Sequence, residues 1–172
     1  KLSKDGAMVV ETGIHTGRSA KDKFVVKESA NKDDIWWENA KEMSEDNFNT
    51  LYKDMTDFSI NKDLFVQDLY GGADLQYRLP TRIYTEYAWH SLFIQNLLIT
   101  VKDEEKSAFD PEFIIIDLPS FKADPNRHGS RSETIIAVNF AKKVVLIAGT
   151  SYAGEIKKSV FTILNYLLPH LD

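Results

Sequence analysis

Residues 144–169, VVLIAGTSYAGEIKKSVFTILNYLLP, form the most clearly patterned stretch of the chain. The apolar run 144–148 is typical of a buried strand, and a turn with glycines at its two ends follows it. Apolar residues then recur at helical spacing, which predicts a helix over 154–168 that Pro169 stops. The stretch therefore predicts a strand, a glycine-rich turn and a helix, and ligand sites favour the carboxyl ends of strands in such units.

Short apolar runs alternate with turn-rich segments through the rest of the chain. Ser44 is suited to cap a second helix, and the apolar face of that helix would be formed by Phe48, Leu51, Tyr52 and Met55. A further helix is expected over 85–99 and a loop over 120–132. Further strands are expected over 7–10, 24–26, 64–69, 113–116 and 134–140. Short connections between neighbouring strands favour some antiparallel pairing, so we predict an α/β fold: a mixed β-sheet packed with helices.

The composition of the 172 residues suits a single domain over 1–172, with 43% apolar residues for its core. A net charge of −5 without a long basic block argues against nucleic-acid binding. The chain has no cysteine, which excludes disulfides and thiolate metal sites. No run reaches the roughly 18 apolar residues of a membrane span, and no signal peptide opens the chain. We therefore expect a cytoplasmic protein without a membrane partner.

The first candidate site is the stretch TGIHTGRSAKDK, residues 12–23, between two predicted strands. Its glycines let the backbone turn and approach an anion closely. The guanidinium of Arg18 matches a carboxylate or a phosphate in shape and charge. No Gly-Lys-Ser/Thr closes the stretch, so it is not a Walker A loop. The residues alone leave two interpretations open: an anion site, or a polar loop with a solvated arginine.

The second candidate site is the turn and helix start at 149–158, which carries Lys157 and Lys158. Cations near a helix start oppose the helix dipole and cost a few tenths to about 1 kcal/mol each. The same position favours an unprotonated amine, which can act as a base or as a metal ligand. On a helical wheel Lys158 shares one side with Thr162 and Asn165. The alternative is that both lysines extend into solvent.

Two further clusters are weaker candidates. Asp68 and Asp74 surround a Gly-Gly pair and could bind a cation, although capping of turns explains them equally well. The basic loop 127–133 could receive an anion or be solvated. The histidines lack metal-ligand spacing, and His90 is expected to be a packed residue in an aromatic-rich helix.

Several long strings together resemble the amino-terminal, substrate-side domain of ATP-dependent phosphoenolpyruvate carboxykinases. The Arg18 stretch with Phe24 resembles the arginine motif of that family, and the 149–159 stretch with Asn165-Tyr-Leu-Leu-Pro169 resembles its lysine motif. The strings at 64–68, 72–74, 77–80 and 85–90 are similar to the blocks between them. These matches keep the order of the family and span nearly the whole chain.

The resemblance implies a lyase of gluconeogenesis that converts oxaloacetate and ATP to phosphoenolpyruvate, CO₂ and ADP. It implies that Arg18 binds the carboxylate of oxaloacetate or the CO₂ formed, and that Tyr152 contacts the same substrate. Lys158 would ligate Mn²⁺ near the transferred phosphate, and Lys157 would help to hold the substrate. The implied cofactors are ATP and Mn²⁺, with Mg²⁺ accompanying the nucleotide.

Two departures and one absence qualify the resemblance. Ala20 stands where the family usually has proline, and Ser151 replaces a commonly larger residue. The nucleotide loop of the family, Gly-x-x-x-x-Gly-Lys-Ser/Thr, does not occur. We therefore expect a chain truncated at both ends that lacks the nucleotide-binding carboxyl-terminal domain and is inactive alone. The alternatives are a free-standing anion-binding or regulatory module, a small-molecule kinase and a protein-interaction domain.

Overall fold

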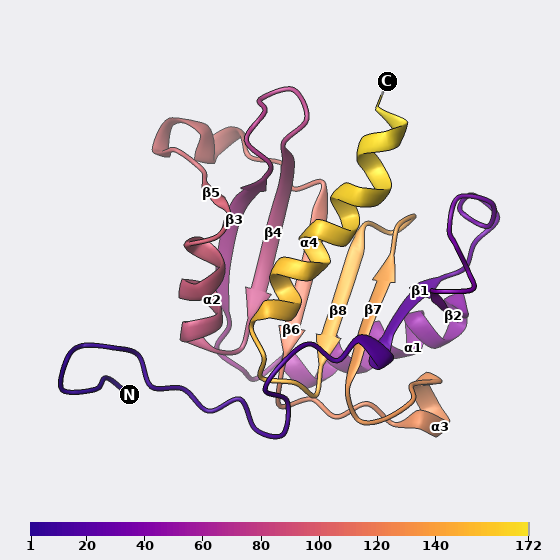
Figure 1. Cartoon of the computed structure of the whole chain (residues 1–172), viewed down its shortest axis with the longest axis horizontal. Coiled ribbons are helices and arrows are strands. Elements are labelled where there is room, and N and C mark those ends of the chain that lie inside the picture. Colours follow the sequence, from indigo (N-terminus) through magenta and orange to yellow (C-terminus); the bar gives the residue numbers. More distant parts are fainter. Residues whose placement is uncertain (172) are drawn as a thin grey trace.

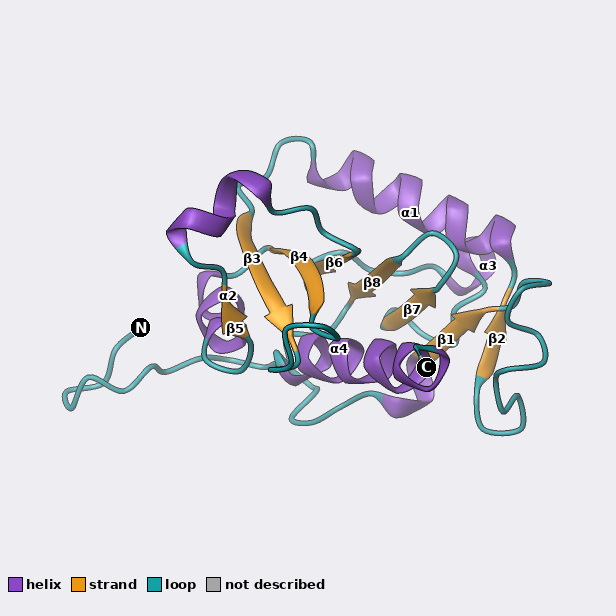
Figure 2. Cartoon of the chain, turned by 90° about the horizontal axis from the view of Figure 1, so that it is seen from above, coloured by secondary structure: helices purple, strands orange, loops and turns teal. Residues whose placement is uncertain are grey.

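A computed structural model describes residues 1–171 as one eight-stranded sheet with helices on both faces (Figures 1 and 2). The strand order is β2-β1-β7-β8-β6-β4-β3-β5, with parallel and antiparallel neighbours, so the predicted mixed α/β sheet is confirmed. The elements are β1 (Lys23–Val26), β2 (Lys41–Met43), α1 (Glu45–Ser59), β3 (Phe65–Gly71), β4 (Leu79–Thr85), α2 (Ala88–Gln95), β5 (Ile99–Thr100), β6 (Phe113–Leu118), α3 (Pro125–His128), β7 (Ile135–Asn139), β8 (Val144–Ala148) and α4 (Gly154–Leu167), with the 3₁₀ turns η1 (Ala20–Asp22), η2 (Asp103–Ala108) and η3 (Leu168–His170).

Helix α1 covers one face of the sheet, and its start was correctly predicted. The Ser44 hydroxyl accepts a hydrogen bond from the Asn47 amide at 3.2 Å, which satisfies one of the free N–H groups of the first turn. Phe48, Leu51 and Met55 are fully buried against the sheet. Burial of each such side chain stabilises the fold by roughly 1.5–3 kcal/mol.

Helix α4 covers the opposite face, as the edge-on view shows (Figure 2). Ile156, Val160 and Ile163 are buried at helical spacing, which confirms the predicted apolar sector. Pro169 does not follow the helix as a loop residue but lies in the 3₁₀ turn η3. Within residues 1–171 no helix is both long and apolar enough to cross a bilayer.

The structure corrects the predictions for two segments. Residues 7–10 do not form a strand: the amino-terminal segment extends away from the sheet (Figure 1), and its one isolated bridge joins Leu2 to Met8. The helix expected over 85–99 is shortened to α2, because Thr85 still pairs in β4 and Ile99 pairs in β5. Within α2, Ile94 is fully buried, whereas Leu92 is 45% exposed.

No strand was predicted over the residues of β4, which contains Pro80, and proline is rare in a central strand. Yet β4 lies between β3 and β6 and pairs with both. The expected loop 120–132 contains the short helix α3, which is capped by the Asp124 carboxylate. The β4 error arises because pairing with distant strands outweighs the local signal of proline, whereas α3 carries local signals, a capping Asp124 and Pro125 in its first turn.

One edge of the sheet gathers the loops that carry the candidate residues, at the bottom of Figure 1. Strands β4, β6 and β8 run parallel and end at this edge. Strand β7 is antiparallel to β8, and β1 is parallel to β7, so both begin there. The turn after β8 and the segment before β1 are therefore neighbours in space.

Candidate functional site

The turn between β8 and α4 has a fixed backbone at its first residue. Gly149 has φ +71°, and a Cβ at this position would lie 2.2 Å from the Glu133 carbonyl oxygen, so only glycine fits. The Thr134 hydroxyl donates to the Gly149 carbonyl at 2.8 Å. The turn is thus tied to the start of β7.

The ring of Tyr152 packs against the first residue of α4. A Cβ on Gly154 would lie 2.5 Å from a ring carbon of Tyr152, so glycine makes room for the ring at the helix start. The Tyr152 amide donates to the Thr150 hydroxyl at 3.2 Å. The partly exposed phenol is thereby held at the sheet edge that carries the other candidate residues.

The Arg18 loop is bound directly to this helix start. The Ser19 amide donates to Oε1 of Glu155 at 2.6 Å, across 136 residues of sequence. The ring of His15 hydrogen-bonds Thr134 Oγ1 at 2.9 Å. Because the Thr134 hydroxyl already donates to Gly149, His15 Nε2 is the donor in that contact. The structure therefore joins the two motifs that the sequence had placed far apart.

A buried carboxylate, Asp22, stabilises the far side of the loop. It is fully buried, and it accepts from Arg131 Nε at 2.9 Å, from Ser132 Oγ at 3.0 Å and from Ser19 Oγ at 2.5 Å. Burial alone would raise the pKa of Asp22, but these hydrogen bonds outweigh burial and hold the pKa below its usual value. Sequence reasoning missed this role, since Arg131 is 109 residues away.

Lys23 is the last residue of the Arg18 stretch, contacts α4, and was not predicted as a site residue. Its Nζ donates to Thr162 Oγ1 at 2.7 Å, on the side of α4 that also carries Lys158. Burial lowers the pKa of Lys23, and the positive charges of Lys158 and Arg18 lower it further. The cations of this region are therefore close enough to repel one another.

Glu155 is the acidic group that faces these cations. It is 5% exposed, and burial raises the pKa of its carboxyl, while the Ser19 amide and Arg18 act in the opposite direction. Its place as the second residue of α4 favours a negative charge. Glu155 lies near Arg18 and Lys23, and Lys158 lies near Lys23, so these three cations outnumber the one carboxyl and leave a surplus of positive charge.

Lys157 and Lys158 are the fourth and fifth residues of α4, which starts at Gly154 as predicted. Lys157 is exposed. Lys158 is partly buried, and its Nζ lies 4.5 Å from the centroid of the Phe161 ring, a cation–π contact that neither motif had suggested. The structure thus brings Arg18, Tyr152 and Lys158 to one edge of the sheet, with Lys157 beside them.

This arrangement suits a small anion with a carboxylate or phosphate group, because the neighbouring cations Arg18, Lys23 and Lys158 can offset its negative charge. A complete metal site is not formed by the described residues. Within residues 1–171 no group of three or more His, Cys, Asp or Glu side chains is arranged to hold a metal ion. The described residues can contribute a ligand such as the Lys158 amine, but they do not provide a full coordination shell.

The two weaker candidate clusters are explained by internal contacts. Asp68 forms a two-fold hydrogen-bonded ion pair with Arg82 at 2.7 and 2.8 Å across β3 and β4. Asp74 accepts from the Gln76 amide at 2.8 Å, which confirms the turn-capping interpretation.

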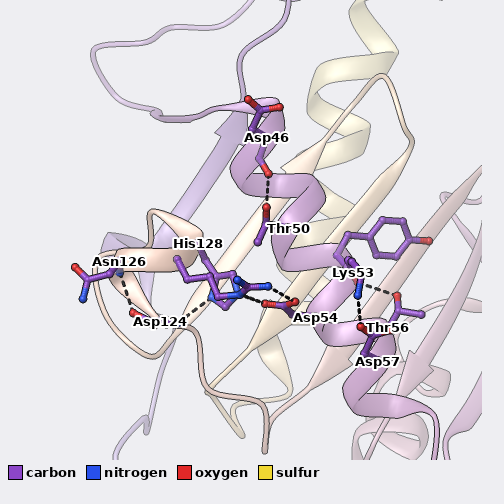
Figure 3. A network of polar contacts seen from close by, with 11 residues as sticks. Asp46, Thr50, Lys53, Asp54, Thr56, Asp57, Asp124, Asn126 and His128 are labelled. Atoms are coloured by element: carbon purple, nitrogen blue, oxygen red, sulfur yellow. Dashed lines mark hydrogen bonds and ion pairs between the residues drawn. The ribbon is translucent and has the colours of Figure 1, made fainter.

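The basic stretch 127–133 forms internal ion pairs, although the Arg127 and Arg131 side chains remain exposed. Arg127 and His128 both bind Asp54 of α1, with His128 Nε2 at 2.9 Å (Figure 3). The hydrogen bonds from Arg127 and then from His128 hold the pKa of the Asp54 carboxyl well below its usual range. His128 Nδ1 accepts from the Asp124 amide at 2.9 Å, so its proton is on Nε2. Arg127 and His128 of α3 thus hold α3 against α1 through Asp54, and these three residues are called the α1–α3 clamp.

Comparison with known proteins gives a consistent result. A family described as phosphoenolpyruvate carboxykinase, in its ATP-dependent form, matches residues 1–172. Similar proteins named phosphoenolpyruvate carboxykinase (ATP) occur in Parvibaculum lavamentivorans, at 62% identity over 98% of this chain and 31% of the relative, and in Mesorhizobium japonicum, at 60% identity over 98% and 32%. A relative from Methylobacterium sp. is 59% identical over 98% of this chain and 32% of its own length. The chain thus spans about a third of the length of these relatives.

Proposed function

Because the chain belongs to the ATP-dependent phosphoenolpyruvate carboxykinase family, we propose that it forms the substrate-side part of an enzyme that converts oxaloacetate and ATP to phosphoenolpyruvate, CO₂ and ADP. Such an enzyme is a carboxy-lyase, and its proposed place is gluconeogenesis in the cytoplasm. The observation that supports this function best is the hydrogen bond from the Ser19 amide to Glu155, which binds the Arg18 loop to the helix of Lys158.

The proposed roles follow from the positions of the cations. Arg18 binds a carboxylate of oxaloacetate, and the Glu155 contact fixes the loop from which it extends. Tyr152, held over Gly154, contacts the same substrate. Lys157 contributes positive charge at the exposed side of the helix. The surplus charge offsets the negative charge of a dicarboxylate and of the phosphoryl group that is transferred.

Lys158 is the proposed ligand for Mn²⁺. When bound, the ion would stabilise the negative charge of the enolate formed by decarboxylation. A ligating amine must be unprotonated, so Mn²⁺ binding at Lys158 would be linked to the release of a proton. The remaining ligands are proposed to come from outside these residues.

The nucleotide is proposed to bind in a carboxyl-terminal domain beyond residue 172. The relatives are about three times as long as the matched region, and no Gly-x-x-x-x-Gly-Lys-Ser/Thr loop occurs in the chain. The chain of 172 residues is therefore proposed to be one domain of a two-part active site. Oxaloacetate and phosphoenolpyruvate would bind between the two parts.

The test is phosphoenolpyruvate formation from oxaloacetate, ATP and Mn²⁺ by the full-length protein, with Arg18→Gln as the variant. Loss of a charge-assisted contact should cost roughly 1.5–3 kcal/mol in kcat/KM for oxaloacetate and leave the KM for ATP nearly unchanged. The isolated 172-residue chain should give no turnover. An unaltered oxaloacetate KM and kcat in Arg18→Gln would contradict the assignment of Arg18, and turnover by the isolated chain would contradict the two-part site.

A further inference from the structure

A buried pair of ionisable side chains lies behind the turn that carries Tyr152. His90 of α2 is 0% exposed and Asp117 of β6 is 1% exposed. His90 Nδ1 lies 2.9 Å from Asp117 Oδ2, and His90 Nε2 lies 2.9 Å from the carbonyl oxygen of Ser151. Neither group belongs to the cationic cluster described above.

The partners of the ring determine where its protons are. A carbonyl oxygen only accepts, so His90 Nε2 carries a hydrogen and donates to Ser151. The contact between Nδ1 and Asp117 then holds one shared proton, on the ring or on the carboxyl, and the pair is neutral overall in both cases. Burial raises the pKa of Asp117, and the hydrogen bond with His90 opposes that effect.

Two aromatic rings also contact the ring of His90. The Trp89 ring lies at a centroid distance of 4.1 Å and the Tyr87 ring at 5.3 Å, both nearly edge-on. The other oxygen of Asp117 has no hydrogen-bond partner within residues 1–171, so the carboxyl is directed to His90 alone. Two hydrogen bonds and two aromatic contacts thus leave the imidazole a single orientation.

In that orientation the His90 ring holds the turn after β8 by a hydrogen bond to the Ser151 carbonyl. Ser151 is the residue before Tyr152, and its carbonyl receives the His90 hydrogen bond across 61 residues of sequence. On one side of Ser151 the turn is tied to β7 through Gly149, and on the other side Tyr152 packs on Gly154. The His90 contact is the tie that joins the middle of the turn to α2.

We propose that His90 and Asp117 are positioning residues for the substrate turn: Asp117 orients the His90 ring, and His90 holds the Ser151 carbonyl, which fixes Tyr152 and the start of α4 against the Arg18 loop. This inference rests on the proposed function. It predicts that the contact to Ser151 matters for oxaloacetate, whereas ATP binding is independent of it.

Two amide variants in the full-length protein separate the two contacts of the ring. In His90→Asn the amide reaches only the position of Nδ1, so it keeps Asp117 and loses Ser151. In His90→Gln the amide reaches the position of Nε2 and can still donate to Ser151. His90→Asn should raise the KM for oxaloacetate by roughly five- to tenfold, the loss expected for one hydrogen bond. His90→Gln should stay within about twofold, and the KM for ATP should be unchanged in both.

A second readout does not depend on turnover. Amide hydrogen exchange of residues 150–155 should become faster in His90→Asn and stay near wild type in His90→Gln. His128→Asn is the matched control, since His128 is also a buried histidine but belongs to the α1–α3 clamp. It should lower the melting temperature without changing either the oxaloacetate KM or the exchange of the turn.

Equal oxaloacetate KM and equal exchange in His90→Asn and His90→Gln would overturn the proposal. If the histidine variants do not fold, Asp117→Asn and Asp117→Ala make the same comparison. Asparagine can donate to Nδ1 and preserve the Nε2 hydrogen, whereas alanine cannot, so only Asp117→Ala should raise the oxaloacetate KM. A wild-type protein that forms no phosphoenolpyruvate would refute the proposed function, and the exchange data would still decide the positioning role.

Discussion

The α1 face of the sheet and the sheet edge beside α4 use charge in opposite ways. On the face of α1, Asp54 accepts hydrogen bonds from Arg127 and His128, and these bonds lower its pKa (Figure 3). At the edge beside α4, Lys23 lies near Arg18 and Lys158, and burial together with these like charges lowers its pKa. The first arrangement stabilises the ionised form of its key group, and the second disfavours it.

The difference separates groups that hold the fold from groups that are available for a ligand. Opposite charges in contact contribute to folding stability. Like charges gathered at one edge cost folding stability, and such arrangements are common where a protein binds or transforms an ion. The edge between the Arg18 loop and α4 is therefore expected to tolerate or even gain stability when its charges are removed, and to lose binding.

The largest expected effect concerns Lys158. In the full-length protein Lys158→Arg should lower kcat by at least about 100-fold, since guanidinium stays charged and offers no lone pair to a metal ion. Titration of Mn²⁺ affinity in wild type, Lys158→Arg and Lys157→Arg is the measurement. Lys157→Arg is the matched control and should change the affinity far less, because Lys157 is exposed. Equal Mn²⁺ affinity in all three proteins would remove Lys158 from the metal site.

Asp54→Asn should have the largest effect on stability. The variant loses a charge-assisted contact to Arg127 and His128, at an expected cost of about 1–2 kcal/mol in the free energy of unfolding. The oxaloacetate KM should stay at its wild-type value. Denaturant unfolding and steady-state kinetics of the same preparation test both statements. A changed KM with unchanged stability would reverse the assignment of the two regions.

The same carboxylate predicts a pH dependence. Because the folded-state pKa of Asp54 lies below the unfolded value, its contribution to stability is present above about pH 4 and is lost as pH falls toward the folded-state pKa. Unfolding free energy measured from pH 6 downward should therefore fall more steeply in wild type than in Asp54→Asn. Parallel curves would show that the contacts with Arg127 and His128 do not lower the folded-state pKa of Asp54.

Glu155→Ala should have an intermediate effect on binding. The Ser19 amide loses its acceptor, the Arg18 loop is no longer tied to α4, and the oxaloacetate KM should rise by about fivefold. Glu155→Gln keeps an acceptor oxygen and should restore most of the affinity. If the two variants raise the KM equally, the charge of Glu155 matters and its hydrogen bond does not.

The smallest expected effect concerns Lys23. Since its folded-state pKa is lowered, the protonated amine costs stability; this cost is fully present below the folded-state pKa and disappears as pH rises from there to the unfolded-state value. Lys23→Met should therefore raise the melting temperature at neutral pH by about 1–2 °C while weakening oxaloacetate binding. Thermal melts at pH 7 compared with wild type, together with the oxaloacetate KM, test this trade-off. A lower melting temperature would show that the contact with Thr162 outweighs the repulsion.

Much of the fold followed from local patterns. The Ser44 cap with its apolar face predicted α1, and the run 144–148 with the following glycines predicted β8 and α4. The prediction failed for 7–10, where an apolar run found no neighbouring strand to pair with. It also missed β4, which contains Pro80 and which two neighbouring strands hold in the sheet.

The sequence by itself determined the family resemblance, the mixed α/β fold and the candidates Arg18, Tyr152, Lys157 and Lys158, because motifs and helical spacing are properties of short segments. Only the tertiary structure decided which groups meet. The Ser19–Glu155, Lys23–Thr162 and His90–Ser151 contacts join residues 136, 139 and 61 positions apart. Such contacts depend on strand order and on which loops share a sheet edge, and no local pattern encodes either.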